Sequence, residues 1–344
     1  MAATPSLLAN WTAVLTTQNL PAGARMDPVS RVLLVIRASV FPMTLVSGLA
    51  GGLLALRAHQ LGLAREADPV CFALAVLGLV VAHAANNMIN DWFDVVGGVD
   101  TEGYVRTVYA PHPILSGLVS RKGLLLAILA ANLVDLAILV RLVEVRGPGA
   151  AAFALAGLFV SVFYVAPPLR LKHHGLGEPG VALVWGPLMI GGTYFVTTGE
   201  APAWVFAASL PYAILVTTVL FGKHVDKHDS DKAKGIRTLP VILGKQRALA
   251  WTRAMMVAFF PLVVALVATG VLGPWCLLTL LAVPKLRTTL ETLRQPPPPE
   301  APPGYPIWPL WYVAWAFVLN RSAGGFFVLG LLLDVLVPLR LPWA

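Results

Sequence analysis

Three carboxylates and two amides lie close together at the end of a long apolar segment. The carboxylates belong to Asp91, Asp94 and Asp100, and the amides to Asn87 and Asn90. On a helix, Asn90 and Asp94 share one side because they are four residues apart. The same spacing places Asn87 and Asp91 on one side. Since Mg²⁺ takes carboxylate and amide oxygens together with substrate phosphates, the sequence predicts an Mg²⁺ site here, with the three carboxylates and Asn90 as candidate ligands.

The two residues after this segment, Gly97 and Gly98, are expected to end the helix and to return Asp100 over the same pocket. A solvated helix end is the plainer interpretation, since a few carboxylates near an interface are ordinary. That interpretation does not account for three polar turns within an apolar helix. Charge at such a depth is costly and usually marks an ion or substrate pathway.

A second acidic cluster, Asp226, Asp229 and Asp231, follows another apolar segment much later in the chain. Two acidic clusters at the ends of two membrane helices predict divalent cations that hold a polyanion. His224 and His228 are four residues apart and could be read as a zinc pair, but no third ligand has matching spacing. A loop with several lysines is more simply a surface that attracts phosphate.

The composition indicates a membrane protein. Of 344 residues, 57% are hydrophobic and 12% are charged, whereas a soluble domain has about 25% charged residues. The formal net charge of +8 does not indicate nucleic-acid binding, because membrane topology can place the basic residues. Cys71 and Cys276 lie in separate apolar stretches, which excludes a disulfide framework. The first 30 residues lack the sequence of n-region, h-region and cleavage site that is typical of a signal peptide, so no cleaved signal is expected.

Apolar segments long enough to cross a bilayer, which needs about 20 residues, recur along the chain. They predict an all-α, polytopic membrane protein of about nine transmembrane helices, in a bundle around a central cavity with cytoplasmic cap loops. A further stretch, 308–319, is too short to cross and is expected to be an interfacial or bundle-packed helix. The nine expected spans are 32–56, 69–93, 122–144, 149–167, 179–199, 203–222, 249–271, 273–290 and 321–338.

The distribution of lysine and arginine predicts the orientation. Basic residues are concentrated in the connections after the second, fourth, sixth and eighth spans, and basic short loops stay cytoplasmic. The N-terminus and both acidic clusters are therefore expected on the cytoplasmic side. Residues 1–30 are expected to form a cytoplasmic segment and residues 31–340 a single transmembrane domain.

Several motifs resemble those of one family. Asn90-Asp91-x-x-Asp94, followed by Gly98-Val99-Asp100, resembles the first aspartate-rich motif of the UbiA superfamily of intramembrane prenyltransferases. The position of Asp100 looks most like the branch that prenylates 1,4-dihydroxy-2-naphthoate in menaquinone synthesis. The resemblance spans roughly residues 37–244. Further stretches that resemble motifs of this family are residues 113–120, 164–172, 175–178, 186–189 and 192–195.

The second acidic motif departs from the family pattern. Its tail, from Asp231 to Arg237, is close to that pattern, but Lys227 stands where relatives usually have an aspartate. Lys223 and His224 stand at positions that are normally amide or acidic, and His112 replaces a usual arginine. These departures leave open a different acceptor, a different reaction, or a lysine ammonium in place of one metal.

The resemblance implies Mg²⁺-dependent transfer of a prenyl group from a polyprenyl diphosphate to an aromatic acceptor within the lipid bilayer. It implies that Asn90, Asp94 and Asp100 serve one metal. Asp226, Asp229 and Asp231 would serve the other. The implied catalytic residues are Asn90, Asp94, Asp100, Asp226 and Asp231, and the implied substrate-binding residues are Lys223, Lys227, Arg237, Tyr164, Arg37 and Asn87, with Tyr164 lining the carbocation pocket.

Two alternatives stay open at this point. A terpene cyclase of the same superfamily would ionise the diphosphate and capture the cation internally. A membrane transporter is the weaker alternative, because transporters place their charges near the bilayer midplane between inverted repeats, whereas both clusters here are expected at one face. Arg37, early in the first span, could either snorkel to the interface or meet the diphosphate. Lys172 is expected to be a positive-inside residue rather than a substrate contact.

Overall fold

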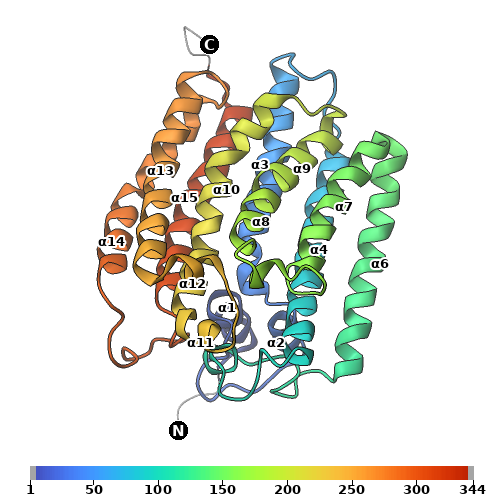
Figure 1. Ribbon diagram of the computed structural model, residues 1–344. Coiled ribbons are helices and arrows are strands. Elements are labelled where there is room, and N and C mark those ends of the chain that lie inside the picture. The colour runs from blue at the N-terminus through green and yellow to red at the C-terminus, as the bar shows by residue number, and fades with distance from the viewer. Residues whose placement is uncertain (1–4, 340–344) are drawn as a thin grey trace.

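The computed structural model describes residues 5–339, and every regular element in that range is a helix (Figure 1). Seven helices are long and apolar enough to cross a membrane. These observations confirm an all-α membrane protein. The seven are α3 with its preceding 3₁₀ turn (Ala38–Gln60), α4 (Pro69–Val96), α6 (Arg121–Arg146), the joined α8 and α9 (Gly177–Thr198), α10 (Ala203–Asp226), α13 (Lys245–Ala268) and α15 (Tyr312–Leu336).

The remaining helices are shorter, and most lie in the connections. Figure 1 places α1, α2, α11 and α12 together at the end of the bundle that holds the N-terminal part of the chain. Among the shorter helices, α7 is apolar but has only 16 residues. Their bounds are α1 (Leu7–Thr17), α2 (Pro28–Val35), α5 (Val105–Tyr109), α7 (Pro148–Phe163), α11 (His228–Ala233), α12 (Leu239–Leu243) and α14 (Val283–Arg294).

Four of the nine expected spans differ from the structure, and the expected count of about nine is not confirmed by the seven candidates. The span 149–167 is the 16-residue α7. The first span does not start at residue 32, because the chain turns at Arg37, whose φ of 53° is left-handed, and α3 proper begins at Phe41. The stretch 273–290 is a 3₁₀ segment followed by α14, whose first turn contains Pro284. The expected break between 308–319 and 321–338 is wrong. One continuous helix of 25 residues begins at Tyr312, since no helix breaker separates the two stretches.

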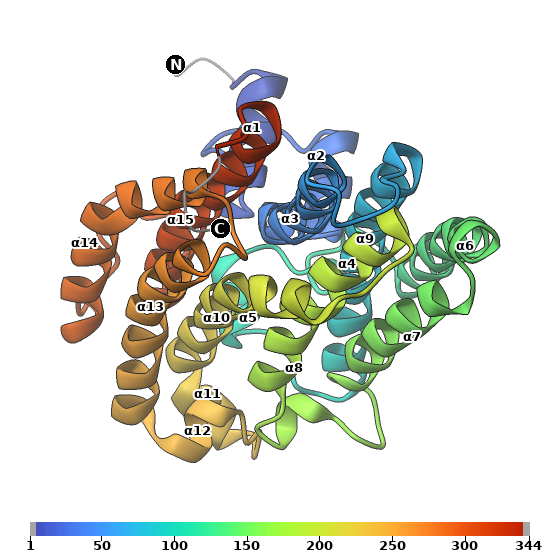
Figure 2. The same ribbon diagram turned by 90° about the horizontal axis from the view of Figure 1, so that it is seen from above.

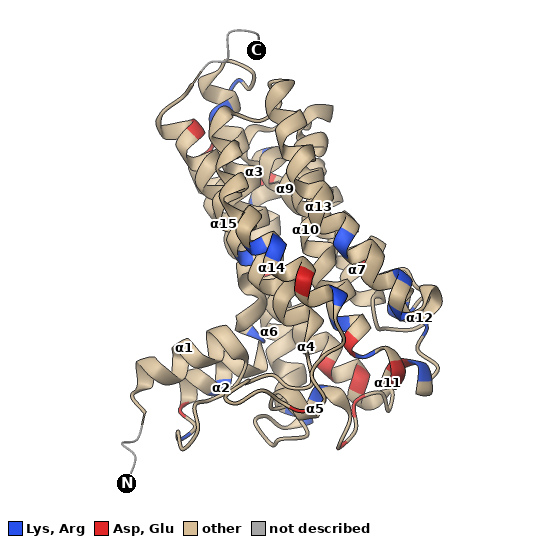
Figure 3. Cartoon of the chain, turned by 90° about the vertical axis from the view of Figure 1, so that its left-hand side faces the viewer, with Lys and Arg blue, Asp and Glu red and all other residues tan. Residues whose placement is uncertain are grey.

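Seen along the helices, the long elements enclose an interior flanked by α4, α8 and α10, with α6 and α7 on one side and α13 and α14 on the other (Figure 2). Charged residues are concentrated around α5, α11 and α12 at one end, while the opposite halves of α3, α9 and α10 carry few (Figure 3). The two acidic clusters therefore lie at the same end of the bundle, as the sequence predicts.

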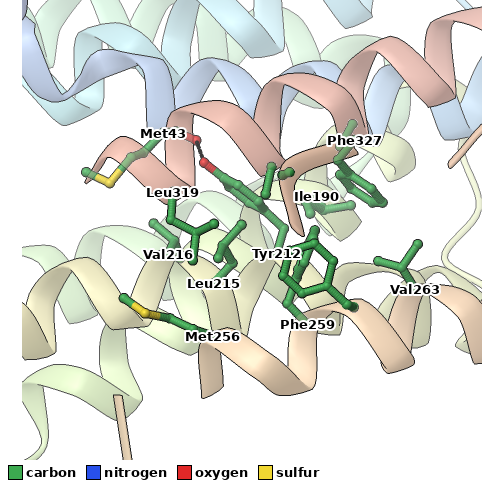
Figure 4. Packing of buried hydrophobic residues seen from close by; sticks show 14 of the residues in the cluster. Met43, Ile190, Tyr212, Leu215, Val216, Met256, Phe259, Val263, Leu319 and Phe327 are labelled. Atoms are coloured by element: carbon green, nitrogen blue, oxygen red, sulfur yellow. Dashed lines mark hydrogen bonds between the residues drawn. The ribbon is translucent and has the colours of Figure 1, made fainter. Parts of the chain in front are cut away.

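A large block of buried side chains joins α10, α13 and α15 (Figure 4). Tyr212, Phe259 and Phe327 come from these three helices and are fully buried. The Tyr212 hydroxyl donates to the carbonyl oxygen of Met43 at 3.2 Å and so links α10 to α3. In lipid, helices associate through close packing and such hydrogen bonds. This block fixes the position of α10, whose last turn carries Lys223 and Asp226.

Candidate active site

Asp91 on α4 is the centre of a buried ion-pair network. Arg37 donates through Nε to Asp91 Oδ2 at 3.0 Å, and the Nε of Arg106 lies 3.4 Å from Oδ1. His112 Nε2 is 3.3 Å from the same oxygen. The nearest ligand atoms of Asp91, Asp100 and His112 lie within 4.8 Å of one another, which is metal-like spacing. Two guanidinium groups already contact Asp91, however, so its predicted role as a metal ligand is replaced by that of an anchor for cations.

Asn90, Asp94 and Asp100 instead face a small polar cavity of about 20 Å³. The backbone N–H of Asp100 donates to the carbonyl oxygen of Asp94 at 2.8 Å, because the chain turns back at Gly98 with φ 70°. The structure thus has the turn predicted from the two glycines. Neither carboxylate oxygen of Asp100 accepts a hydrogen bond of good geometry, although Oδ2 lies 3.4 Å from His112 Nε2, and Asn90 Oδ1 has no partner. Such buried, unpaired oxygens are costly and mark a place for a cation.

Asp231 is the only member of the second cluster that joins this group. Its carboxylate accepts a hydrogen bond from the Tyr104 hydroxyl, and Oδ1 lies 3.5 Å from Lys227 Nζ. Its other oxygen, Oδ2, is buried without a partner. Lys227 lines the small polar cavity together with Asp94 and Asp100. The two acidic motifs therefore meet in space, but through one carboxylate of the second cluster.

The other predicted residues of the second motif lie elsewhere. Asp226 accepts from the backbone N–H groups of Tyr312 at 2.9 Å and Val313 at 3.0 Å, so it caps the start of α15. Gly222 permits this contact, because a Cβ there would lie 2.9 Å from backbone atoms of Val313. The Asp229 side chain is 84% exposed beside His228. Arg237 is exposed and lines neither cavity of the site.

We expect Asp226→Ala to reduce stability rather than chemistry. Loss of a helix-capping carboxylate costs about 0.5–2 kcal/mol. The folded fraction should retain its metal affinity, because both oxygens of Asp226 bind α15 instead of facing the cavity. Unfolding in detergent and Mn²⁺ titration of the same sample would check both statements. If the folded variant no longer binds Mn²⁺, Asp226 contributes to the metal site after all.

A second, much larger cavity of about 790 Å³ extends from the polar cluster into the bundle. Apolar residues of α4, α6, α7, α9, α10 and α15 contribute to its lining, among them Leu79, Leu139 and Phe153. The large cavity also reaches the amide of Asn87, which donates to the carbonyl oxygen of Ile36 at 3.0 Å. The residues common to both cavities are Arg37, Asn90, Arg106, Tyr164 and Lys223. A charged compartment thus opens directly into an apolar one.

The sequence model of the UbiA prenyltransferase family matches residues 44–298, which are most of the chain. The chain belongs to this family. Membership makes it a prenyltransferase and confirms the resemblance seen in its motifs.

Curated relatives of this UbiA-family chain are distant. A 1,4-dihydroxy-2-naphthoate octaprenyltransferase of Bacillus subtilis is 24% identical over 220 residues, which are 64% of this chain and 70% of that protein. A digeranylgeranylglyceryl phosphate synthase of Natronomonas pharaonis is 30% identical over 58% of this chain and 66% of its own length. The human UbiA prenyltransferase domain-containing protein 1 is 23% identical over 65% of this chain and 64% of its own.

Solved structures share the fold. The apo structure of a UbiA homolog from Aeropyrum pernix has a TM-score of 0.64 at 18% identity and covers 86% of this chain and 98% of its own. A UbiA homolog from Archaeoglobus fulgidus, bound to GPP and Mg²⁺, has a TM-score of 0.55 at 15% identity, with 86% and 99% covered. At these identities the likeness establishes the UbiA fold of the chain.

Sequence reasoning missed several residues of this UbiA site. Lys172 Nζ donates to both oxygens of Asp94, at 2.9 and 3.0 Å, and is buried. Lys172, expected only as a positive-inside residue, therefore also contacts a carboxylate of the site. The signal was its place at the end of the Tyr164–Lys172 motif. Tyr104 and Arg106 gave no comparable signal, because their roles arise only when the loop after α4 folds over the site.

His224 and Glu178 form a buried pair next to Tyr164, at the edge of the small polar cavity. His224 Nδ1 lies 2.6 Å from a carboxylate oxygen of Glu178, and its Nε2 lies 3.4 Å from the Tyr164 hydroxyl. This series of contacts links α8, α10 and the end of α7. With Glu178 as its partner, His224 is not half of a zinc pair with His228, which lies beside Asp229 instead.

Opposite charges favour the ionised forms of Lys172, His112 and Asp100. Burial alone would lower the pKa of Lys172, but the Asp94 carboxylate outweighs it and the pKa is raised. Burial would also lower the pKa of His112, yet contacts with two carboxylates raise it above the usual 6.5. The pKa of Asp100 is held below its ordinary value because His112 and Lys227 outweigh its burial. The compartment can therefore present anionic oxygens and cationic nitrogens to one ligand.

Proposed function

We propose that this prenyltransferase moves a prenyl group from a prenyl diphosphate to an aromatic acceptor, with Mg²⁺ as its cofactor. The observation that carries the proposal is the direct junction of two unlike compartments at Tyr164 and Arg37. A prenyl diphosphate has the same division, with an anionic head and an apolar tail. The small polar cavity, of about 20 Å³, has room for a metal ion, the residues shared by the two cavities would meet the diphosphate head at the junction, and the cavity of about 790 Å³ suits the tail.

The oxygens of the site fit Mg²⁺. Asn90, Asp94 and Asp100 would hold the ion, since Asp100 and Asn90 offer buried oxygens without hydrogen-bond partners. This set matches the preference of Mg²⁺ for one or two carboxylates plus substrate phosphates. When bound, the ion would neutralise the diphosphate and stabilise charge on the leaving oxygens.

Basic side chains of the chain would orient the diphosphate. Lys172, from the connection after α7, and Lys223 and Lys227, from the end of α10, line the small cavity together with Arg106. When the carbon–oxygen bond of the prenyl diphosphate breaks, its electron pair stays on diphosphate, and preorganised cations lower the cost of that charge. Lys172 would exchange part of its contact with Asp94 for a phosphate oxygen.

Tyr164 would stabilise the other product of the bond cleavage. It lines both cavities, so its ring lies near the junction where the allylic carbon becomes positive. An aromatic ring attracts a cation held over its face. An electron-rich aromatic carbon of the acceptor would then form the new bond, and loss of its ring proton would restore aromaticity.

The acceptor proposed is a dihydroxynaphthoate-like compound. Two kinds of support point that way: the first acidic motif, and the relatives in Bacillus subtilis and Haemophilus influenzae, both named 1,4-dihydroxy-2-naphthoate octaprenyltransferase. The relative in Natronomonas pharaonis favours a glyceryl phosphate acceptor instead. Both acceptors therefore belong in one assay.

The test is mass spectrometry of the products made by the purified chain from prenyl diphosphates of several lengths. Dihydroxynaphthoate, a hydroxybenzoate and a glyceryl phosphate acceptor are offered in separate reactions, with and without a chelator. We expect a prenylated naphthoate only when Mg²⁺ is present. A hydrocarbon released without acceptor would identify a cyclase, and product formed at full rate with chelator would refute the metal site.

A further inference from the structure

The second acidic motif supplies a single carboxylate to the site. Asp226 uses both oxygens to cap α15, and the side chain of Asp229 is 84% exposed. Asp231 alone is buried beside the polar cavity, and it already contacts Tyr104 and Lys227. A single carboxylate, with only Oδ2 free of a partner, is a poor cage for a divalent cation, which in proteins usually needs several oxygen ligands.

A buried ammonium group lies beside that carboxylate. Lys227 Nζ is 3.5 Å from Asp231 Oδ1, and its side chain is 5% exposed. The same Nζ lies 4.7 Å from the centre of the Tyr104 ring, which fixes it from a second side. Lys223, one helical turn earlier on α10, also lines the small cavity. A cation next to Asp231 would therefore meet one or two ammonium groups at close range, where like charges repel strongly.

We propose that this enzyme binds one divalent cation, held by Asn90, Asp94 and Asp100, and that Lys227 occupies the place of a second. This inference rests on the proposed function of the site. In the reaction, the carbon–oxygen bond breaks and its electron pair remains on the diphosphate oxygen. Lys227 donates hydrogen bonds to the diphosphate and keeps its proton, as a point-charge phosphate binder does.

The test counts bound metal ions. The full chain in detergent is titrated with Mn²⁺ in the presence of geranyl thiolodiphosphate, whose carbon–sulfur bond resists ionisation, and free Mn²⁺ is followed by electron paramagnetic resonance. We expect one Mn²⁺ per chain. Lys227→Asp would place two carboxylates four residues apart, with Asp231, and is expected to bind two Mn²⁺ whose spectra broaden each other.

Two further variants serve as controls. Lys232→Asp makes the same charge change at an exposed lysine and should leave the count at one. Lys227→Met removes the ammonium without adding a ligand, so the count should stay at one while the dissociation constant of the analogue rises about 10- to 100-fold.

Two Mn²⁺ per wild-type chain would overturn the inference, and this result needs no variant to fold. A folded Lys227→Asp chain that binds the analogue with one Mn²⁺ would also overturn it, because Lys227 would then not hold the second place. Failure of the proposed function has a different signature: the wild-type chain would bind neither the analogue nor Mn²⁺.

Discussion

Replacing Asp94 with alanine is expected to reduce kcat/KM for prenyl transfer by at least about 10³-fold. The Asp94 carboxylate faces the small polar cavity as a candidate Mg²⁺ ligand and receives two hydrogen bonds from Lys172. The substitution removes a proposed metal ligand and leaves a buried ammonium group without its partner. Initial rates of product formation at several Mg²⁺ concentrations measure the effect.

Two variants separate these contributions. Asp94→Asn keeps the shape and an oxygen but loses the charge, so high Mg²⁺ should restore part of its rate. Asp229→Ala removes an exposed carboxylate of the second motif and should retain the wild-type rate. A rate for Asp94→Ala within tenfold of wild type would show that Asp94 is not in the catalytic site.

The first acidic motif could be predicted from the sequence because its geometry is local. Asn90 and Asp94 share a helix face by their spacing, and Gly98 allows the turn that returns Asp100 to the same cavity. Long apolar segments likewise indicated most spans, since crossing a bilayer requires a minimum length. Features set by a few neighbouring residues are visible in a sequence.

The second motif depends on contacts between distant segments and was less predictable. Nothing near Asp226 shows that its carboxylate caps a helix that begins at Tyr312, 86 residues later. The sequence does not show that Asp231 contacts Tyr104. It also does not show that Lys172 contacts Asp94, which lies 78 residues earlier in the chain. Tertiary packing therefore gives the aspartates of the second motif different roles, although their side chains are chemically identical.

The position of Arg37 was also undetermined by its surroundings in the sequence. An apolar stretch continues on both sides of it, which predicted an unbroken span. In the structure Arg37 adopts left-handed backbone geometry, which is uncommon for a residue with a side chain, and its guanidinium contacts Asp91. The break thus coincides with an ion pair between Arg37 and Asp91 of α4, and the Arg37 side chain points to this network instead of snorkelling to the interface.

Asp91→Asn is expected to lower the free energy of unfolding by about 3–5 kcal/mol, the usual cost of removing one partner of a buried ion pair. Asp91 is completely buried and contacts Arg37, Arg106 and His112. The amide would leave two guanidinium groups near each other without a counter-charge. Equilibrium unfolding of the purified protein in mixed micelles measures the change.

A matched control is Asp229→Asn, which makes the same substitution at an exposed site and should change the free energy of unfolding by no more than about 0.5 kcal/mol. If both variants unfold alike, Asp91 is not the anchor of the network. The folded fraction of Asp91→Asn should still bind Mn²⁺, because Asp91 lines neither cavity. The folded fraction of Asp94→Ala should instead lose metal binding. That contrast assigns neighbouring carboxylates of one motif to two tasks, Asp91 to holding the loops in place and Asp94 to the chemistry.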